Sequence, residues 1–409
     1  MGSLFAELDR QSPANARREV ELYGREIPEF RSWETNPRAR SETMDYSVWL
    51  RRRTIELSPD NSELSADDLR YIAAIGEIRA GAGMSSDSRQ RVLRLHTTLM
   101  LRDIQEAAES LRGGNVEELM QVMTWFAPQG DRGIVAYRQG FVTVLRRRLP
   151  YVEQVALLAR SLLTGDPLAT DLAAALELEL PEFCAVTVIR VPDSPLGDRD
   201  LDGEIETLVK THRAPVVWHP ETGTRGGELI AVVPCADEAI PLPSAPDAAP
   251  DTAPDAVADL VGDFAETLGR PCAAGTATAP LDELPEALER ARRISRSAPL
   301  GKPSRRLRPC TMADVFVELA VADVPFVDAW LRTVDRRLAP GPDLVTTLDA
   351  YYRHDMNRGA AAAALNVHPR TLDYRLRRVA ELTGIDPGSA HGVRTLSAVV
   401  TRRLSGAWA

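Results

Sequence analysis

The sequence is poor in cysteine and has no long apolar stretch, and both shortages limit what the protein can be. No stretch approaches the 18 consecutive apolar residues that suggest a membrane-spanning helix. The first residues lack the apolar core of a signal peptide. The cysteines are far apart and form no C-x-x-C pair, which argues against a zinc site and against a disulfide scaffold; they are Cys184, Cys235, Cys272 and Cys310. We therefore expect a cytoplasmic protein without a metal, another cofactor or a membrane partner.

Lysine is also scarce, since Lys210 and Lys302 are the only lysines among 49 basic residues. We attribute this to the coding bias of a G+C-rich genome and give it no functional weight. The 409 residues, 44% hydrophobic and 26% charged, have the composition of a folded soluble protein and are long enough for two to four domains.

The charge is distributed unevenly along the chain. The net charge is −10, but residues 344–409 hold 9 Arg or Lys against 5 Asp or Glu, a local balance of +4 that leaves −14 on residues 1–343. Such asymmetry between segments indicates a module that binds nucleic acid or another anion at the C-terminal end.

Residues 1–165 are predicted to be helical. The apolar positions between Leu93 and Leu111 recur every three or four residues, as in an amphipathic helix that Gly113–Gly114 ends. Further helical patterns cover 116–126 and 137–163, with Gly130 and Gly133 in the gap. No catalytic constellation is evident. We expect core or surface roles, not ligand binding, for His96, Trp33, Trp49 and Trp125.

Residues 166–300 change to a mixed pattern. Strands are expected at 185–191, 215–218, 228–233 and 272–278, and helices at 259–269 and 284–297. We predict the order β-α-β-β-α-β-α, which is that of a ferredoxin-like or nucleotide-cyclase-like α/β sandwich. The proline-rich segment Ala239–Ala256 is expected to be a disordered insertion.

A proline-rich break at 299–309 predicts a linker at 301–310 before a third domain at 311–409. Its Arg305, Arg306 and Arg308 are open to two interpretations, a solvated basic linker or contacts with phosphate. The fold class expected overall is multidomain α and α+β: a helical N-terminal domain, an α/β sandwich and a C-terminal helix-turn-helix bundle.

The segment 358–383 has the pattern of a helix-turn-helix. Asn357 can cap a short alanine-rich helix, Asn366 can adopt the left-handed conformation of a sharp turn, and Pro369 suits the start of the next helix. An apolar stripe then faces inward at Leu372, Leu376, Val379 and Leu382.

The outward face of the second helix is basic. A projection at 100° per residue places Arg370, Tyr374, Arg377 and Glu381 opposite the apolar stripe, with Arg378 beside them and Arg375 near the buried edge, where we expect a structural ion pair. A helix with this face can enter the major groove of DNA. The predicted DNA-binding residues are Arg358, His368, Arg370, Thr371, Tyr374, Arg377 and Arg378.

These motifs resemble a known family. The runs 344–352, 361–376 and 381–386, which include L-x-V-H-x-x-T-L-x-Y-R-L, resemble the C-terminal helix-turn-helix of PucR/CdaR-type transcriptional regulators across roughly 311–405. Glu77–Gly83 with the long helix after it is similar to the helical sensory domain of that family and of stressosome co-antagonists, and the middle segment resembles a degenerate GGDEF-like domain. The resemblance implies a DNA-binding regulator that responds to a small-molecule or protein signal.

A rival hypothesis is a diguanylate cyclase, because Arg225–Ile230 (RGGELI) stands where active cyclases carry G-G-[DE]-E-F. Two-metal phosphoryl chemistry needs clustered carboxylates. Glu228 retains one acid, but Leu229 replaces the second, and the first strand carries Arg190 with its nearest acid at Asp193, beyond Pro192. We therefore predict that the domain is not an enzyme.

An alternative to DNA binding is a signalling scaffold whose helix-turn-helix mediates protein contacts. Because a single helix-turn-helix makes few DNA contacts, we expect a homodimer or higher even-numbered oligomer, held through apolar stripes of the N-terminal and central domains such as 93–111 and 119–126.

Overall fold

The computed structural model describes residues 3–33, 36–111, 116–192, 201–221, 226–235 and 255–408, which form two compact units, Met1–Pro150 and Tyr151–Ala409. Several predicted features lie outside the described residues. They are the glycine pair 113–114, Asp193, Arg225, residues 239–254 of the expected insertion, and the side chain of Trp33. The last two residues of that expected insertion instead begin a helix.

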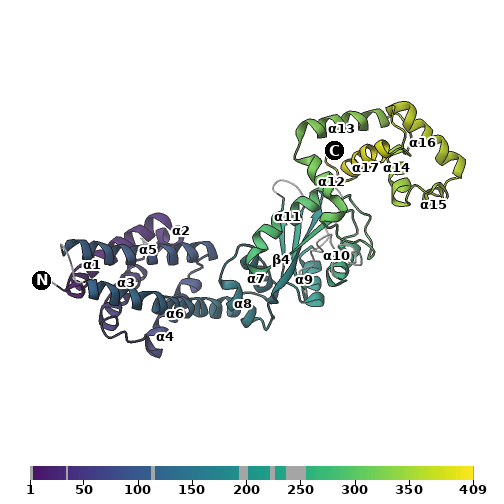
Figure 1. Cartoon of the computed structure of the whole chain (residues 1–409). Helices are drawn as coiled ribbons and strands as arrows, with labels where there is room; N and C mark the ends of the chain where they lie inside the picture. Colours follow the sequence, from purple (N-terminus) through teal and green to yellow (C-terminus); the bar gives the residue numbers. More distant parts are fainter. Residues whose placement is uncertain are drawn as a thin grey trace. The chain divides into compact units, whose positions relative to one another are not determined.

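The described part of the first unit is helical, as predicted (Figure 1). In the expected amphipathic helix, Met100, Ile104 and Ala107 are buried, so that its apolar stripe faces the interior of the unit. Trp125 is buried as well. The helices are α1 (Leu4–Glu26), α2 (Pro28–Trp33), α3 (Pro37–Leu57), α4 (Ala66–Gly81), α5 (Ser86–Ser110) and α6 (Val116–Arg148).

The gap expected around Gly130 and Gly133 does not exist, because α6 runs through both glycines. Glycines on this helix let α4 approach closely: a Cβ on Gly140 would lie 2.0 Å from the carbonyl oxygen of Ala73. The helical pattern predicted over 137–163 is instead broken near Pro150, where α6 ends at Arg148, because a proline disfavours the helical conformation of the residue before it.

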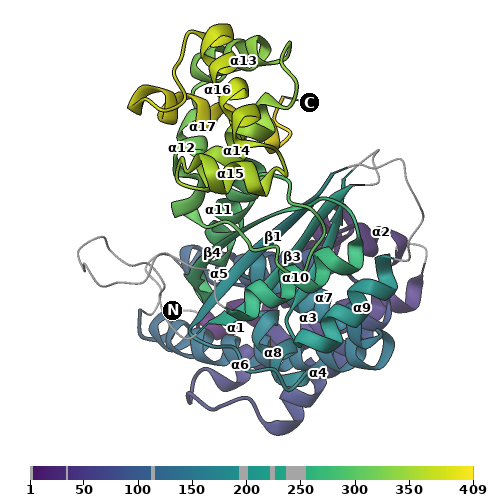
Figure 2. The same cartoon turned by 90° about the vertical axis from the view of Figure 1, so that its right-hand side faces the viewer.

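The second unit contains an α/β sandwich in the predicted order β-α-β-β-α-β-α. Its four strands form an antiparallel sheet in the order β2-β3-β1-β4, in which Val188 of β1 is opposite Ile230 of β3 and Gly275 of β4. Helices α9 and α10 pack side by side against one face (Figure 2). The elements are β1 (Phe183–Val191), α9 (Leu201–His212), β2 (Val216–Pro220), β3 (Gly227–Cys235), α10 (Asp255–Leu268), β4 (Ala273–Pro280) and α11 (Leu284–Ser297).

Helix α7 (Tyr151–Leu163), which the sequence reading placed in the N-terminal part, belongs to the second compact unit together with α8 (Leu168–Ala175). Val155 of α7 is 1% exposed and lies in the same apolar core as the sheet residues Ile189 and Leu229. The second unit therefore begins at Tyr151, about fifteen residues before the expected boundary.

The segment expected to be a linker is packed along the edge strand β4. The Cys272 and Gly301 backbones exchange hydrogen bonds, and the Cys310 N–H donates to the carbonyl oxygen of Ala274 at 2.8 Å. An edge strand has unpaired backbone groups, and this segment satisfies part of them. The Arg305 Nε lies 3.1 Å from Asp263 and 2.8 Å from Glu266, so this arginine pairs with protein carboxylates.

The C-terminal helices pack around a core that includes Leu331, Leu348, Leu372 and Leu396. The fold class predicted from the sequence is confirmed. None of the helices in the described ranges is both long and apolar enough to span a membrane. The C-terminal helices are α12 (Met312–Ala322), α13 (Pro325–Leu338), α14 (Leu344–Arg353), α15 (Arg358–Ala364), α16 (Pro369–Thr383) and α17 (Ala390–Leu404).

Candidate nucleic-acid interface

Helices α15 and α16 are joined by the sharp turn that the sequence predicts (Figure 1). The side chain of Asn357 accepts a hydrogen bond from the Ala360 N–H at 3.1 Å and so caps α15. Asn366 has a φ of 53°, the left-handed conformation that asparagine tolerates better than most residues. Pro369 is the first residue of α16. These residues end one helix and begin the next within a few positions.

His368, a predicted DNA contact, has a structural role at this turn. It is the N-cap of α16, and its ring Nδ1 accepts a hydrogen bond from the Arg370 N–H at 3.2 Å. The residue remains exposed. Sequence reasoning did not identify the cap because histidine is not among the usual N-cap residues.

The orientation of α16 agrees with the projection from sequence. Leu372, Leu376 and Val379 are at most 6% exposed and contribute to the core of the C-terminal helices. Leu382 is partly buried against the same core. The opposite face of the helix is therefore turned to solvent.

Four of the predicted DNA-binding residues lie exposed on that outer face: Arg370, Thr371, Tyr374 and Arg377. Tyr374 is 58% exposed. Among the described residues the Arg370 guanidinium takes part in no hydrogen bond or ion pair, and that of Arg377 makes only a 3.4 Å hydrogen bond to the Asp373 carbonyl oxygen of its own helix. These side chains keep most of their donors available for a ligand.

The remaining two predicted residues are held by carboxylates. Arg378 pairs with Glu381 at 2.9 Å on the same helix. Arg358 pairs with Asp373 at 3.2 Å and thereby connects α15 to α16. Sequence reasoning missed Asp373, because its partner is fifteen positions away in the chain and no local pattern marks the pair.

The expected structural role of Arg375 is confirmed. Its side chain is 16% exposed and reaches α14, where it pairs with Asp343 at 3.0 Å and donates to the Thr347 hydroxyl at 3.3 Å. Three neighbouring arginines of one helix thus differ in role, since Arg375 is used within the fold whereas Arg370 and Arg377 face outward.

An arginine can donate two hydrogen bonds to the O6 and N7 atoms of guanine, and an α-helix fits the major groove of B-DNA. Threonine and tyrosine hydroxyls can donate to phosphate. The outer face of α16 therefore has the donors that a DNA-reading helix requires, on a helix fixed by the buried face.

The hairpin that resembles a cyclase motif differs from an active cyclase in the surroundings of its motif residues. The Glu228 carboxylate is bound by Arg292 of α11 at 2.9 Å, and Leu229 is fully buried. Opposite Glu228 in the β1–β3 pair is Arg190, which donates to the carbonyl oxygen of Ser405 at 2.9 Å. Burial lowers the pKa of Arg190 from its ordinary value. Within the described ranges no three potential His, Cys, Asp or Glu ligands are grouped as a metal site requires.

Comparison with known sequences identifies two domains. The profile of the PucR C-terminal helix-turn-helix domain matches residues 344–400, which contain the α15–α16 turn. The profile of the GGDEF-like domain matches residues 163–296, which contain the four-stranded sheet.

Individual relatives share shorter regions. A protein of uncharacterized function from Mycobacterium tuberculosis is 36% identical over 96 residues, 23% of each chain. The carbohydrate diacid regulator of Escherichia coli is 49% identical over 43 residues, 10% of this chain and 11% of that protein. The chain thus aligns with less than a quarter of the length of these curated relatives.

One solved structure is similar to a larger part of the chain. It is a regulator of polyketide synthase expression from Bifidobacterium adolescentis, with 21% identity over 63% of this chain and 96% of that chain. Its TM-score of 0.26 is too low to indicate a shared overall arrangement. The chain therefore contains a GGDEF-like domain followed by a PucR C-terminal helix-turn-helix domain.

Proposed function

We propose that this protein is a DNA-binding transcriptional regulator that reads double-stranded DNA with α16. The single observation that carries the proposal is the exposed face of Arg370, Thr371, Tyr374 and Arg377 on a helix-turn-helix that matches the PucR C-terminal domain. The Escherichia coli relative is also named as a regulator.

The residues divide into two roles in this proposal. Arg370 and Arg377 read base edges, because their guanidinium groups are exposed and have no carboxylate partner within the described residues. Arg358 and Arg378 contact phosphates. On binding DNA, each gives up its ion pair with a protein carboxylate and pairs with a phosphate instead. Tyr374 and Thr371 add hydroxyl contacts, and His368 fixes the N-terminal end of the helix.

Genome-wide mapping of bound DNA tests the proposal, followed by binding of the purified full chain to a mapped site at several salt concentrations. Phosphate contacts release counterions, so the affinity must fall as salt is added, and log Kd must rise linearly with the logarithm of the salt concentration. The alternative function, a scaffold that uses the helix-turn-helix for protein contacts, predicts no enriched sites and no such dependence.

We infer that the GGDEF-like domain is not a cyclase. The inference is supported by the Arg292 side chain on Glu228, which competes with a cation for that carboxylate, and by the apolar Leu229 at the next motif position. Incubation of the full chain with GTP and Mg²⁺, with detection of the nucleotide products, tests it. Formation of a cyclic dinucleotide would contradict the inference.

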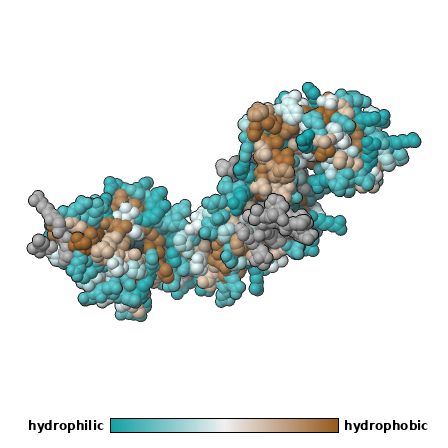
Figure 3. Space-filling model, viewed as in Figure 1, coloured by the Kyte–Doolittle hydropathy of each residue, from teal (hydrophilic) through white to brown (hydrophobic). Residues whose placement is uncertain are grey.

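We also propose that the protein acts in the cytoplasm as a homodimer or a higher even-numbered oligomer on a palindromic or repeated site. The stripes first expected to form the interface are largely used within the first unit, where Ile104, Val122 and Trp125 are buried. Apolar side chains instead gather on the surface of α12 and α13 (Figure 3), namely Met312, Phe316, Val317, Phe326 and Trp330.

A second copy of the chain is the partner that this surface suits. One helix-turn-helix buries a modest area of DNA, and two half-sites one helical turn apart are the usual arrangement for specific binding. Because α13 packs directly against α16, an interface on α12 and α13 would fix the spacing of two reading helices. A symmetric pair would place the same residues on both sides of the interface.

A further inference from the structure

The first unit contains a cavity of about 420 Å³ that none of the features above uses. It lies among the helices α1, α3, α4, α5 and α6, and most of its wall is apolar, including Ile72, Leu93, Met100, Trp125 and Ile134. Cavities of this size and character hold small organic ligands in proteins.

One residue of the wall is a buried cation. Arg79 of α4 is 4% exposed and lines the cavity. Aromatic rings surround its guanidinium carbon at 5.4 to 5.9 Å, and they belong to Tyr23, Phe30, Tyr46 and Tyr137. Its single side-chain hydrogen bond within the described residues is a long one, 3.4 Å to the hydroxyl of Tyr137.

No described carboxylate forms an ion pair with Arg79. A buried charge is costly unless an opposite charge and hydrogen bonds compensate it. Arginine does not escape this cost by losing its proton. The aromatic faces compensate part of the cost through cation–π contacts, but the described residues offer the guanidinium only the one long hydrogen bond to Tyr137.

A second buried arginine nearby in the same unit provides the comparison. Arg51 is also 4% exposed, but it forms ion pairs with Glu19 and with Asp103, the latter at 2.9 Å. The Glu19 carboxylate additionally lies 2.7 Å from His96 Nδ1 and accepts from the Ser47 hydroxyl. The described residues of the unit therefore supply two carboxylates to Arg51 and none to Arg79.

We propose that the cavity binds a small organic anion, a monocarboxylate with an apolar body, whose carboxylate pairs with Arg79. Guanidinium and carboxylate form two parallel hydrogen bonds, and the apolar wall accommodates the rest of the molecule. A single carboxylate is expected because the other basic side chain in the wall, His96, is engaged by Glu19. The site itself does not depend on the proposed DNA binding, although a regulatory effect of the ligand does.

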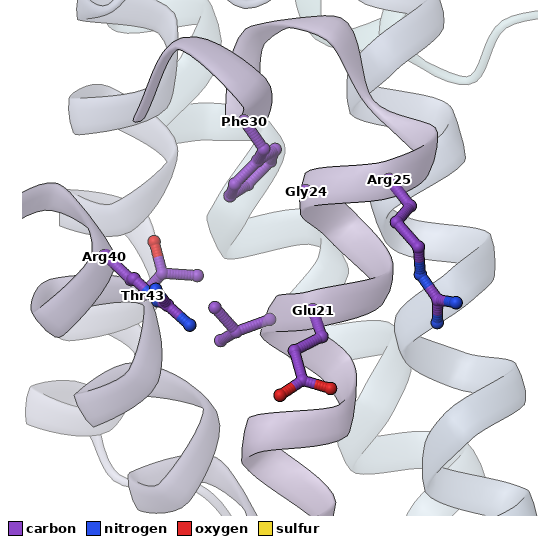
Figure 4. A pocket seen from close by; sticks show the side chains of 7 residues that line it. Glu21, Gly24, Arg25, Phe30, Arg40 and Thr43 are labelled. Atoms are coloured by element: carbon purple, nitrogen blue, oxygen red, sulfur yellow. The ribbon is translucent and has the colours of Figure 1, made fainter. Parts of the chain in front are cut away.

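A second hollow of the same unit does not have these properties (Figure 4). It has a volume of about 340 Å³ beside α1, α2 and α3, and Glu21, Arg25 and Arg40 line it. All three charged side chains are exposed to water and are of both signs. Their charges are therefore solvated without a ligand.

Calorimetric titration of the full chain with octanoate tests the proposal, with octanamide and octylammonium as probes of the same length. We expect octanoate to bind at least tenfold more tightly than either control. Arg79→Met, which keeps an unbranched side chain but removes the charged guanidinium, should lower the octanoate affinity at least tenfold. The matched variant Arg40→Met, in the other hollow, should leave it unchanged.

A variant that blocks the cavity keeps the test decisive if Arg79→Met fails to fold. Thr97 is half-buried and lines the cavity, so Thr97→Trp should abolish binding of octanoate and octanamide alike while Arg79 remains. Circular dichroism establishes that each variant is folded. The proposal is overturned if octanamide binds wild type as tightly as octanoate, if a folded Arg79→Met or Thr97→Trp keeps wild-type affinity, or if neither octanoate nor phenylacetate nor decanoate binds.

The link to regulation is a separate measurement. The affinity for a mapped DNA site is determined with and without saturating octanoate. A change of affinity in wild type that is lost in Arg79→Met would connect the cavity to DNA binding. Absence of any DNA binding would contradict the proposed function while leaving the result for the cavity intact.

Discussion

At the scale of single residues, the environment of an arginine decides its role in this chain. Arg51 and Arg375 are buried or nearly so and pair with carboxylates of other helices. Arg370 and Arg377 belong to the same residue type but project from α16 into solvent. The number of carboxylates within reach, and the exposure of the guanidinium, separate structural arginines from the candidate base-reading arginines.

The first prediction concerns these outward arginines. Arg370→Ala and Arg377→Ala should each lose roughly 1–3 kcal/mol of specific binding, because each removes a bidentate contact with a base, and neither should unfold the domain. Tyr374→Phe should cost less, since it removes one hydroxyl. Fluorescence anisotropy with a mapped DNA site measures the loss. Arg17→Ala is the control, because it removes the same charge at an exposed position of α1. Wild-type affinity in both α16 variants would contradict the assignment.

A second residue-scale prediction concerns Glu19. Burial acts to raise the pKa of Glu19, but His96 and Arg51 outweigh it and hold the pKa below its ordinary value of 4.5. A carboxyl with a depressed pKa in the folded state contributes stability above its unfolded pKa, and this contribution is lost as pH falls from about 4.5 through the lower folded value. The first unit should therefore become less stable as the solution is acidified below about pH 4.5.

The variant Glu19→Gln tests this dependence. At pH 7 it should destabilise the first unit by about 3–5 kcal/mol, because it breaks a buried ion pair. It should also weaken the acid dependence of the urea midpoint that helical circular dichroism reports. Glu21→Gln, on the same helix but exposed, is the matched control. An unchanged midpoint for Glu19→Gln at both pH 7 and pH 4 would refute the prediction.

At the scale of elements, short-range patterns predicted the helix-turn-helix well. The Asn357 cap, the left-handed Asn366 and the initial Pro369 each act within one turn of helix, so the local sequence contains the information. The same patterns predicted the order of strands and helices along the chain in the sandwich. They failed at α6, which runs without a break through Gly130 and Gly133, the glycines expected to interrupt it.

The element-scale prediction concerns the buried face of α16. Leu372 is fully buried and Leu376 is 6% exposed. Leu372→Ala and Leu376→Ala should each destabilise the second unit by about 2–5 kcal/mol, through lost apolar contacts and the cavity left behind. Thermal denaturation measures the loss of stability. Leu382→Ala, at a partly buried position, should destabilise the unit less. Melting curves identical to wild type for both would mean that the helix faces the other way.

At the scale of the whole molecule, the exposed apolar surface of α12 and α13 leads to the prediction on assembly. Light scattering of the full chain at micromolar concentration should give twice the mass of one chain or a higher even multiple. The double variant Phe326→Glu with Trp330→Glu should be monomeric and bind a mapped site more weakly, because charges cannot enter an apolar interface without cost.

The exposed Ile78 of α4 is a suitable position for comparison, because Ile78→Glu adds a charge to an apolar surface residue of the first unit. It should leave the mass unchanged. A monomeric wild-type protein would contradict the dimer proposal. If the double variant still forms an even-numbered oligomer, the interface does not lie on α12 and α13.

The sequence by itself determined those features that depend on neighbours within a turn or a strand: the helical N-terminal part, the order of the sandwich, the helix-turn-helix, and the inward and outward faces of α16. Only the tertiary structure decided features that join distant residues. These are the packing of α7 with the sheet, the docking of 299–310 on β4, the Arg358–Asp373 pair, and the absence of a described carboxylate partner for Arg79. Ion pairs and backbone pairing across tens of positions depend on how elements pack, and no local periodicity records that packing.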